Sequence, residues 1–421
     1  MSDILLAGDA QAVAQVDSLD ITAYDAATTY RVTIGGKIVG VAGTTDAPTT
    51  EAAYVTAHNA SLYNEFEEIT ATRPSGSVLL TADTLGKSFV AASSVSGGAG
   101  TIGAVTPVTA CEGPSVLSAN NCKNASTGAR TLPVAADTLT LEHLDVDLLY
   151  GLEALAGLTL AALYINASFE AQCGLPPYNA AGAYDEYRPL YLKAPASLVR
   201  IGAGDGDGSP LVMYDAGSVQ TAIEVYATDT PALDGLHACM VKGTHASNTL
   251  KVTGDSTVDV APFAGEVATF LTVTVTGNAE VRTGKGTTLG TLHVGGSATV
   301  EIDSAAALAD ITAINVYDEA TVIIRGDNAV TAINAYGPTA RVVYLSSGTA
   351  AAVNLFDGAQ FDCEENPSSF TITTLGGSGA PTINDPNSRM TVTNAIGANN
   401  SNVFAWTWQL KPSRTITLGA P

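Results

Sequence analysis

A ten-residue phrase recurs seven times between Thr249 and Leu375, and it constrains the fold more than any other feature of the chain. In every copy the second position is Leu, Ile or Val, the fourth is apolar in all but one, and the sixth is Gly or Asp. This pattern is typical of a short strand that ends at a corner. The copies begin about twenty residues apart, at Thr249, Thr272, Thr291, Ala313, Ala332, Ala352 and Thr371. Such a period predicts a β-solenoid, because single coils can bury their apolar faces only by stacking.

Composition agrees with a mainly β chain. Apolar residues make up 46% of the sequence but aromatic residues only 6%, so small and β-branched side chains dominate. We therefore expect a right-handed parallel β-helix of about 20 residues per coil, preceded by a small α+β domain. The expected division is an attachment domain over 1–92, a linker or extended arm over 93–136, the β-helix over 137–393 and a C-terminal cap over 394–421. The cap would contain Trp406 and Trp408 and cover the open end of the solenoid.

The N-terminal domain has its own local signals. Strands over 30–34 and 37–41 flank Gly35 and Gly36, which predicts a hairpin. A helix is expected after Asp46, with its apolar face formed by Ala52, Val55, Leu62 and Phe66, and further strands over 68–73, 77–82 and 88–92. We expect the three acidic residues at the end of the helix to be exposed to solvent: Glu65, Glu67 and Glu68.

The first coils of the solenoid are less regular than the later ones. Segments 158–165, 197–201 and 222–225 fit inward-facing strands. The stretch from Ala162 to Leu198 is longer than one coil, so residues 175–188, with three tyrosines and two prolines, are predicted to form a loop excursion. Loops of this kind often carry function on a rigid scaffold.

The outer face of the repeats holds the candidate site. If the second and fourth positions point inward, the third and fifth point outward. The third positions form an amide row, Asn315, Asn334 and Asn354, and the fifth positions form a large apolar strip, Tyr317, Tyr336, Phe356 and Leu375. Soluble monomers usually avoid such a patch. Either the strip is buried between copies of the chain, most plausibly in a homotrimer, or it is a platform for sugar rings; a register error of one residue would instead place it in the core.

Other candidates for chemistry have plainer interpretations. Asp205 and Asp207 alternate with glycines as in a calcium loop, but the bidentate Glu at the twelfth position is absent, which favours a turn. Asp318 and Asp357 lie two coils apart, about 9.6 Å at strand spacing, near the limit for an inverting glycosidase pair. A further acidic cluster follows the sixth copy, Asp362, Glu364 and Glu365.

The cysteines and histidines add no catalytic or metal-binding pattern. The five cysteines lack Cys-x-x-Cys spacing, so free thiols are expected, with a disulfide between Cys111 and Cys122 as the alternative. The five histidines are scattered, and His293 is expected to be solvated on the outer face. We expect no catalytic residues, no cofactor and no metal.

Several segments carry a resemblance to a known family. They are the run from Leu80 to Val90 together with 145–152, 173–176, 186–192 and 242–248. These segments resemble modules of largely uncharacterised structural proteins of bacteriophages and prophage-like regions, over about residues 1 to 300. The resemblance implies a virion structural role and brings no catalytic residues with it.

Net charge and the N-terminal sequence limit the partners and the location that we expect for the protein. A formal charge of −23 with 18 Lys and Arg argues against binding to nucleic acid. No cationic leader precedes the first apolar run and no long apolar span follows, so we expect synthesis in the host cytoplasm, no membrane insertion and a place on the virion surface. The expected function is a non-enzymatic virion structural protein, a capsid decoration or tail fibre component held to a major capsid or tail protein through residues 1–92. The alternative is a tailspike that binds or cleaves a host-surface glycan.

Overall fold

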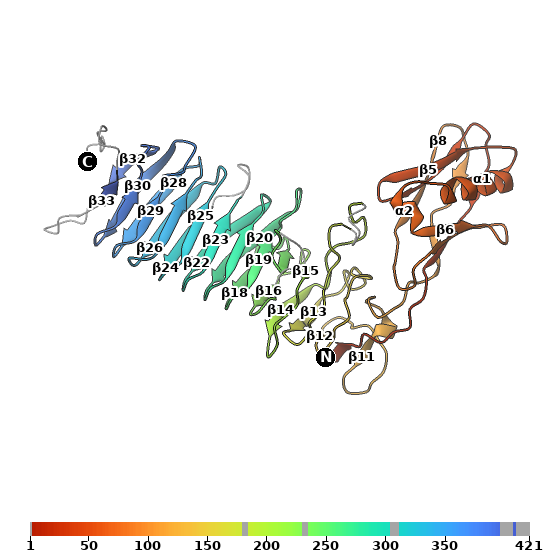
Figure 1. Ribbon diagram of the computed structural model, residues 1–421, viewed down its shortest axis with the longest axis horizontal. Coiled ribbons are helices and arrows are strands. Elements are labelled where there is room, and N and C mark those ends of the chain that lie inside the picture. The colour runs from red at the N-terminus through yellow and green to blue at the C-terminus, as the bar shows by residue number, and fades with distance from the viewer. Residues whose placement is uncertain (1, 179–183, 230–234, 304–310, 396–406, 410–421) are drawn as a thin grey trace.

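The computed structural model describes residues 2–178, 184–229, 235–303, 311–395 and 407–409. The protein is mainly β, with 45% strand and 5% helix. Figure 1 shows a small module that carries the helices and a long stack of strands, which meet at an angle near the N-terminus.

The stack is a β-solenoid of about 11 turns of roughly 22 residues each, which confirms the predicted fold class. Its strands form two sheets, one of 14 strands and one of ten. From β12 to β32 the strands of the first sheet pair in parallel: β12 (Thr138–Leu141), β13 (Leu160–Asn166), β14 (Ala196–Ala203), β16 (Ala222–Val225), β18 (Thr249–Val252), β20 (Ala268–Val275), β22 (Thr287–Val294), β24 (Ala313–Tyr317), β26 (Val330–Tyr336), β28 (Ala350–Phe356), β30 (Phe370–Ser378) and β32 (Met390–Ala395). The second sheet is also parallel: β15 (Val212–Asp215), β17 (Cys239–Lys242), β19 (Thr257–Val260), β21 (Glu280–Thr283), β23 (Thr299–Ile302), β25 (Thr321–Ile324), β27 (Arg341–Tyr344), β29 (Gln360–Asp362), β31 (Thr382–Asn384) and β33 (Thr407–Gln409).

Apolar ladders hold the coils together. In β24 the side chains of Ile314 and Val316 are fully buried, and they pair in register with Ile333 and Ala335 of the next coil. Burial of each aliphatic side chain contributes ~1.5–3 kcal/mol, so the ladder is the main source of solenoid stability. The corner after β24 is made by Asp318 at φ 56°, a left-handed conformation that Gly and Asp tolerate better than most residues.

The small module has a separate core. Its strands are β2 (Val16–Leu19), β3 (Ile21–Ala23), β4 (Thr29–Ile34), β5 (Lys37–Ala42), β6 (Ile69–Thr72), β7 (Val78–Ala82), β8 (Ala91–Ser96), β9 (Thr101–Ile102) and β10 (Thr106–Thr109), and its helices are α1 (Ala47–Asn59) and α2 (Asn64–Glu67). They form sheets in the orders β10-β2-β7-β6, β5-β4-β8 and β3-β9. The predicted hairpin is β4 and β5, with Ile34 paired to Lys37 across the two glycines.

The helical face differs from the prediction. The helical segment breaks into α1 and α2, and Leu62 between them is 90% exposed. The buried side of α1 is largely polar: Thr50, Glu51, Tyr54 and His58. Hydrogen bonds stabilise this polar side of the helix. His58, for example, is hydrogen-bonded to the Tyr54 hydroxyl at 2.9 Å and to the Ile69 carbonyl at 2.8 Å. The apolar spacing was therefore right for Phe66 and Val55, which pack in the module core, but wrong for Ala52 and Leu62, which are exposed.

The division at residues 92 and 136 was also wrong. Strand β1 (Asp3–Leu6) belongs to the solenoid, where it pairs in parallel with β12. Strand β11 (Cys122–Asn124), which follows the 3₁₀ turn η1 (Ala119–Asn121), covers the outer edge of β1 in antiparallel fashion. Residues 93–136 are thus no linker, since β8 to β10 complete the module and β11 covers the first edge of the solenoid.

Most of the predicted cap, 394–421, lies outside the described residues. Within it, β33 pairs in parallel with β31, so the ten-stranded sheet continues to Gln409. The predicted inner strands over 158–165, 197–201 and 222–225 correspond to β13, β14 and β16 and are confirmed.

Candidate functional site

The third positions of the repeats form a hydrogen-bonded ladder on the outside of the 14-stranded sheet. Asn354 donates its amide to the Asn334 side-chain oxygen at 2.9 Å, and Asn334 donates to Asn315 at 2.9 Å. The ladder begins one coil earlier, because the Asn315 amide lies 3.4 Å from Nδ1 of His293. His293 is therefore half-buried in the ladder rather than simply solvated. Side-chain amides stacked at strand spacing stabilise the stack itself.

The aromatic strip lies beside this ladder and points outward as predicted. Tyr317 and Tyr336 stack with ring centroids 5.2 Å apart and planes 8° apart, and Tyr336 and Phe356 stack at 5.0 Å and 10°. Both tyrosines are 37% exposed. Burial, with Tyr336 as a neighbour, raises the pKa of the Tyr317 hydroxyl above its ordinary value. Because the rings cover each other's faces, the strip presents mainly ring edges and hydroxyl groups to the outside.

Leu375 does not belong to the strip, and its predicted position was wrong. Its side chain is 1% exposed and pairs in register with Val353, an inward residue. The seventh copy is displaced by three residues, so that Thr374 lies opposite Ala352 and Ser378 opposite Phe356. β30 is a long strand that buries two apolar residues three positions apart, Ile372 and Leu375, just as β20 buries Phe270 and Val273. The displacement arises because either residue fits the apolar pattern of the repeat. The strip therefore consists of Tyr317, Tyr336 and Phe356.

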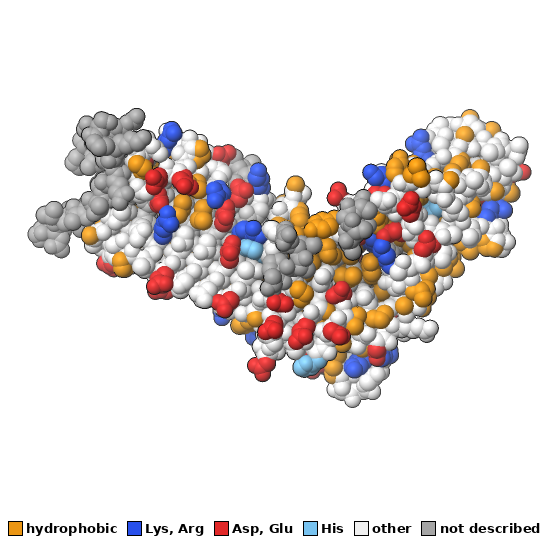
Figure 2. All heavy atoms as spheres, viewed as in Figure 1, with side chains coloured by type: hydrophobic (Ala, Val, Ile, Leu, Met, Phe, Trp, Pro, Cys, Tyr) orange, Lys and Arg blue, Asp and Glu red, His pale blue; other side chains and the backbone are white. Residues whose placement is uncertain are grey.

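Charge distinguishes this surface from the rest of the solenoid. Seven neighbouring strands of the 14-stranded sheet contain no Asp, Glu, Lys or Arg, although 14% of the chain is charged; they are β20, β22, β24, β26, β28, β30 and β32. We call their outer surface the uncharged face. The ten-stranded sheet differs, because Asp259, Arg282, Glu301, Arg341 and Asp362 lie in its strands. Figure 2 shows charged side chains gathered along one band of the solenoid, beside a broad band with few of them.

The predicted carboxylate sites serve the backbone and neighbouring coils. Asp318 and Asp357 both occupy left-handed corners, and the Asp318 carboxylate accepts a hydrogen bond from the Gly296 amide at 3.1 Å. Asp362 is paired with Arg341 and accepts from Asn384 at 3.1 Å. Glu364 accepts from the same amide at 3.0 Å. These bonds show that the carboxylates of Asp318, Asp362 and Glu364 link neighbouring coils.

No metal centre appears in the described part of the chain. Asp205 and Asp207 are exposed in the turn between β14 and β15, and no group of three His, Cys, Asp or Glu side chains that could hold an ion occurs among the described residues. All five cysteines are free thiols. Burial raises the pKa of Cys122 to about 12 and that of Cys111 to about 11, which keeps both protonated at neutral pH.

A functional contact that the sequence did not reveal joins the module to the solenoid. Arg188, at the end of the predicted excursion, is 4% exposed and binds Glu186 through two nitrogens at 2.5 and 2.8 Å. The same guanidinium donates to the Ser88 carbonyl at 2.8 Å and lies 3.3 Å from Glu68.

Glu68 is therefore part of this contact and not a solvated residue. Burial acts to raise its pKa, but hydrogen bonds from Lys87 and Tyr184 and the charge of Arg188 outweigh it and lower the pKa below the ordinary value. The carboxylate thus stays ionised and binds across the junction.

The fold and this surface define the chain as a β-solenoid protein with an N-terminal α+β module and an uncharged outer face. In comparisons with protein-family models, with curated proteins and with solved structures, no match to the chain was found. None of the helices in the described ranges is long and apolar enough to cross a membrane.

Proposed function

We propose that the chain is a non-enzymatic structural protein of a phage-like virion, in which copies associate side by side through the uncharged face. The module would hold the protein to a capsid or tail protein, and the solenoid would project from the particle surface as a decoration or a fibre component. One observation carries the proposal, the uncharged face with its aromatic strip.

The charge distribution supports association with a second copy of the same chain. A chain of net charge −23 repels its own copies, so a close contact is least costly where neither surface carries charge. Interface cores are depleted of charged residues and enriched in Tyr and Phe. The strip supplies both tyrosine and phenylalanine at the centre of seven charge-free strands. A homotrimer remains the proposed state, since three such faces can close around one axis.

A glycan platform on the strip is less well supported. A sugar ring stacks on the exposed face of an aromatic ring, but Tyr336 is covered on both faces by Tyr317 and Phe356. The amides of the neighbouring ladder also bond one another. The geometry of the strip therefore favours a protein partner over a saccharide.

Imaging of particles tests the virion role. Particles purified from a culture that produces this protein should carry rod-shaped projections on their exterior, and antibodies against the chain should label them. Labelling confined to free protein, with none on particles, would contradict the proposal.

A further inference from the structure

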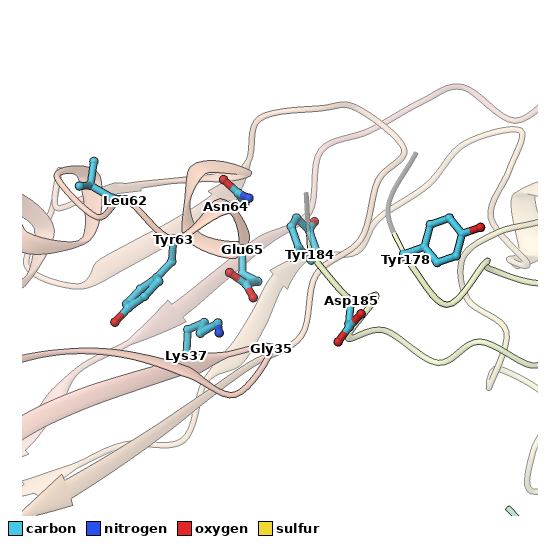
Figure 3. Close-up of a pocket in the computed structure, with 9 residues that line it drawn as sticks. All are labelled: Gly35, Lys37, Leu62, Tyr63, Asn64, Glu65, Tyr178, Tyr184 and Asp185. Atoms are coloured by element: carbon cyan, nitrogen blue, oxygen red, sulfur yellow. The ribbon is translucent and has the colours of Figure 1, made fainter. Parts of the chain in front are cut away.

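A cavity of about 670 Å³ opens where the module meets the excursion from the solenoid. One wall comes from the β4–β5 hairpin, the segment that joins α1 to α2 and α2 itself, and it includes Lys37, Tyr63 and Glu65. The other wall comes from the excursion and includes Tyr178, Tyr184 and Asp185 (Figure 3). Tyr178 and Asp185 pair there through an isolated antiparallel β-bridge.

Glu65 is the unusual member of this lining. Its side chain belongs to α2 and the residue is only 4% exposed. No hydrogen bond or ion pair reaches its carboxylate from the part of the chain that the structure describes. In Figure 3 the carboxylate points away from α2, toward the side on which Lys37 and Asp185 lie. Its oxygens are not among the fully enclosed unpaired atoms of the described residues, so they open onto the cavity, where a ligand can donate hydrogen bonds to them.

Close packing fixes the position of Glu65. A Cβ atom added at Gly35 in the hairpin turn would approach Glu65 Cγ to 2.9 Å and Tyr187 to 3.2 Å. The glycine, which also has φ 56°, therefore lets the hairpin lie directly against α2 and the excursion. The Glu65 side chain therefore packs against the hairpin turn beside the cavity.

The remaining lining indicates the class of ligand. Tyr63 is 46% exposed and Tyr178 is 41% exposed, so both rings are available for contact with an apolar surface. Carboxylates of Glu65 and Asp185 accept hydrogen bonds, and Lys37 donates them. Because Lys37 lies 5.9 Å from the centre of the Tyr63 ring, a cationic ligand would meet a like charge there. Charges of both signs beside aromatic rings fit a neutral molecule with many hydroxyl groups.

We propose that this cavity binds a neutral saccharide unit, with Glu65 accepting hydrogen bonds from sugar hydroxyls and Tyr63 contacting the face of the ring. The site is separate from the uncharged face, and it is independent of the association of copies.

Binding of the full-length protein to a panel of neutral oligosaccharides tests the site. The panel would contain oligomers of glucose, galactose, mannose, N-acetylglucosamine and N-acetylgalactosamine, with Nα-acetylarginine amide as a cationic probe, and binding would be followed by saturation-transfer NMR and calorimetry. We expect at least one oligosaccharide to bind at millimolar concentration or below. Glu65→Gln should weaken that binding by at least about tenfold, because it removes a charged acceptor of nearly unchanged shape.

Two further variants complete the test. Glu67→Gln changes an exposed carboxylate of the same helix that does not line the cavity, so it should leave binding unchanged. Tyr63→Ala alters an exposed side chain, should leave the protein folded and should also weaken binding, which keeps the test decisive if Glu65→Gln fails to fold. No binding to any oligosaccharide, binding of the arginine probe alone, or sugar binding unaffected by both Glu65→Gln and Tyr63→Ala would overturn the proposal.

Discussion

Ile314 and Asn315 are adjacent in β24 but have opposite environments. Ile314 is fully buried in the apolar ladder, whereas Asn315 is half-buried in the outer amide ladder. Alternation along one strand thus separates the residues that hold the fold from those that shape its surface. The same alternation makes single substitutions on neighbouring residues informative.

We predict that Ile314→Asp prevents the solenoid from folding and that Asn315→Ala leaves it folded. An unpaired carboxylate in the ladder costs several kcal/mol, whereas loss of the amide bonds costs about 1–2 kcal/mol. Yield of soluble protein and the denaturant midpoint measure both effects. Equal loss of soluble protein from the two variants would show that the inward and outward positions are assigned wrongly.

His58 gives the module a dependence on pH. Burial lowers its pKa below the ordinary value of 6.5, against the opposing hydrogen bond to the Ile69 carbonyl. At pH values between the lowered pKa and 6.5, the unfolded chain binds more protons at this histidine than the folded chain does. The contribution of His58 to the free energy of unfolding is therefore fully present above pH 6.5 and decreases as the pH falls through this range.

The prediction is a lower urea midpoint at about pH 5.5 than at about pH 7.5, with a smaller difference in His58→Gln. Burial raises the pKa of Asp17 and so acts in the opposite direction at lower pH. Asp17 is present in both proteins, so the difference between them isolates His58. Identical pH dependence in the two proteins would show that His58 does not cause it.

At the scale of elements, the junction between the module and the excursion rests on Arg188. Its guanidinium is nearly inaccessible and joins Glu186, Glu68 and the Ser88 carbonyl. Removing one partner of a buried ion pair costs about 3–5 kcal/mol, because the other charges remain buried. We therefore expect Arg188 to help maintain the angle between the two bodies in Figure 1.

We predict that Arg188→Gln lets the module separate from the excursion while both bodies stay folded. Small-angle X-ray scattering should then show a broader distribution of interatomic distances. Arg200→Gln is the matched control, because its pair with Glu224 is 43% and 24% exposed and lies on the solenoid surface. Scattering curves that are the same for the wild type and both variants would contradict the assigned role of Arg188.

The repeats made the solenoid and most of its outward strip predictable. Apolar residues at every second position, within a unit that recurs about every twenty residues, are compatible with few folds other than a β-solenoid. They failed at β30, where Ile372 and Leu375 are both apolar and a displacement of three residues satisfies the core equally well. The junction could not be predicted, since Glu68 and Arg188 are far apart in sequence and are brought together only by tertiary packing. The polar face of α1 was missed for a related reason, because the partners of Glu51 and His58 lie in other elements.

At the scale of the whole molecule, the two sheets of the solenoid have different roles in the proposed assembly. In that assembly the charged residues of the ten-stranded sheet would face solvent, and the uncharged face would contact another copy. A contact between two uncharged faces forms no ion pairs, while the remaining charge of each copy opposes it.

Association should therefore strengthen with salt. Raising the ionic strength shortens the range of the repulsion between copies of charge −23. It weakens no attraction at the contact, because two uncharged faces form no ion pairs. Sedimentation velocity at low and high sodium chloride measures this directly. Weaker association at high salt would indicate an interface built on ion pairs, contrary to the uncharged face.

The most direct test of the central claim is the solution mass of the full-length protein compared with that of Tyr336→Glu, by light scattering at matched concentrations. We predict three times the monomer mass of 42.7 kDa for the wild type and the monomer mass for Tyr336→Glu, since a carboxylate at the middle of the strip would be buried between copies. Thr321→Glu, which places the same charge on the outer side of β25, should keep the wild-type mass. A monomeric wild type, or equal masses for the wild type and Tyr336→Glu, would contradict the account.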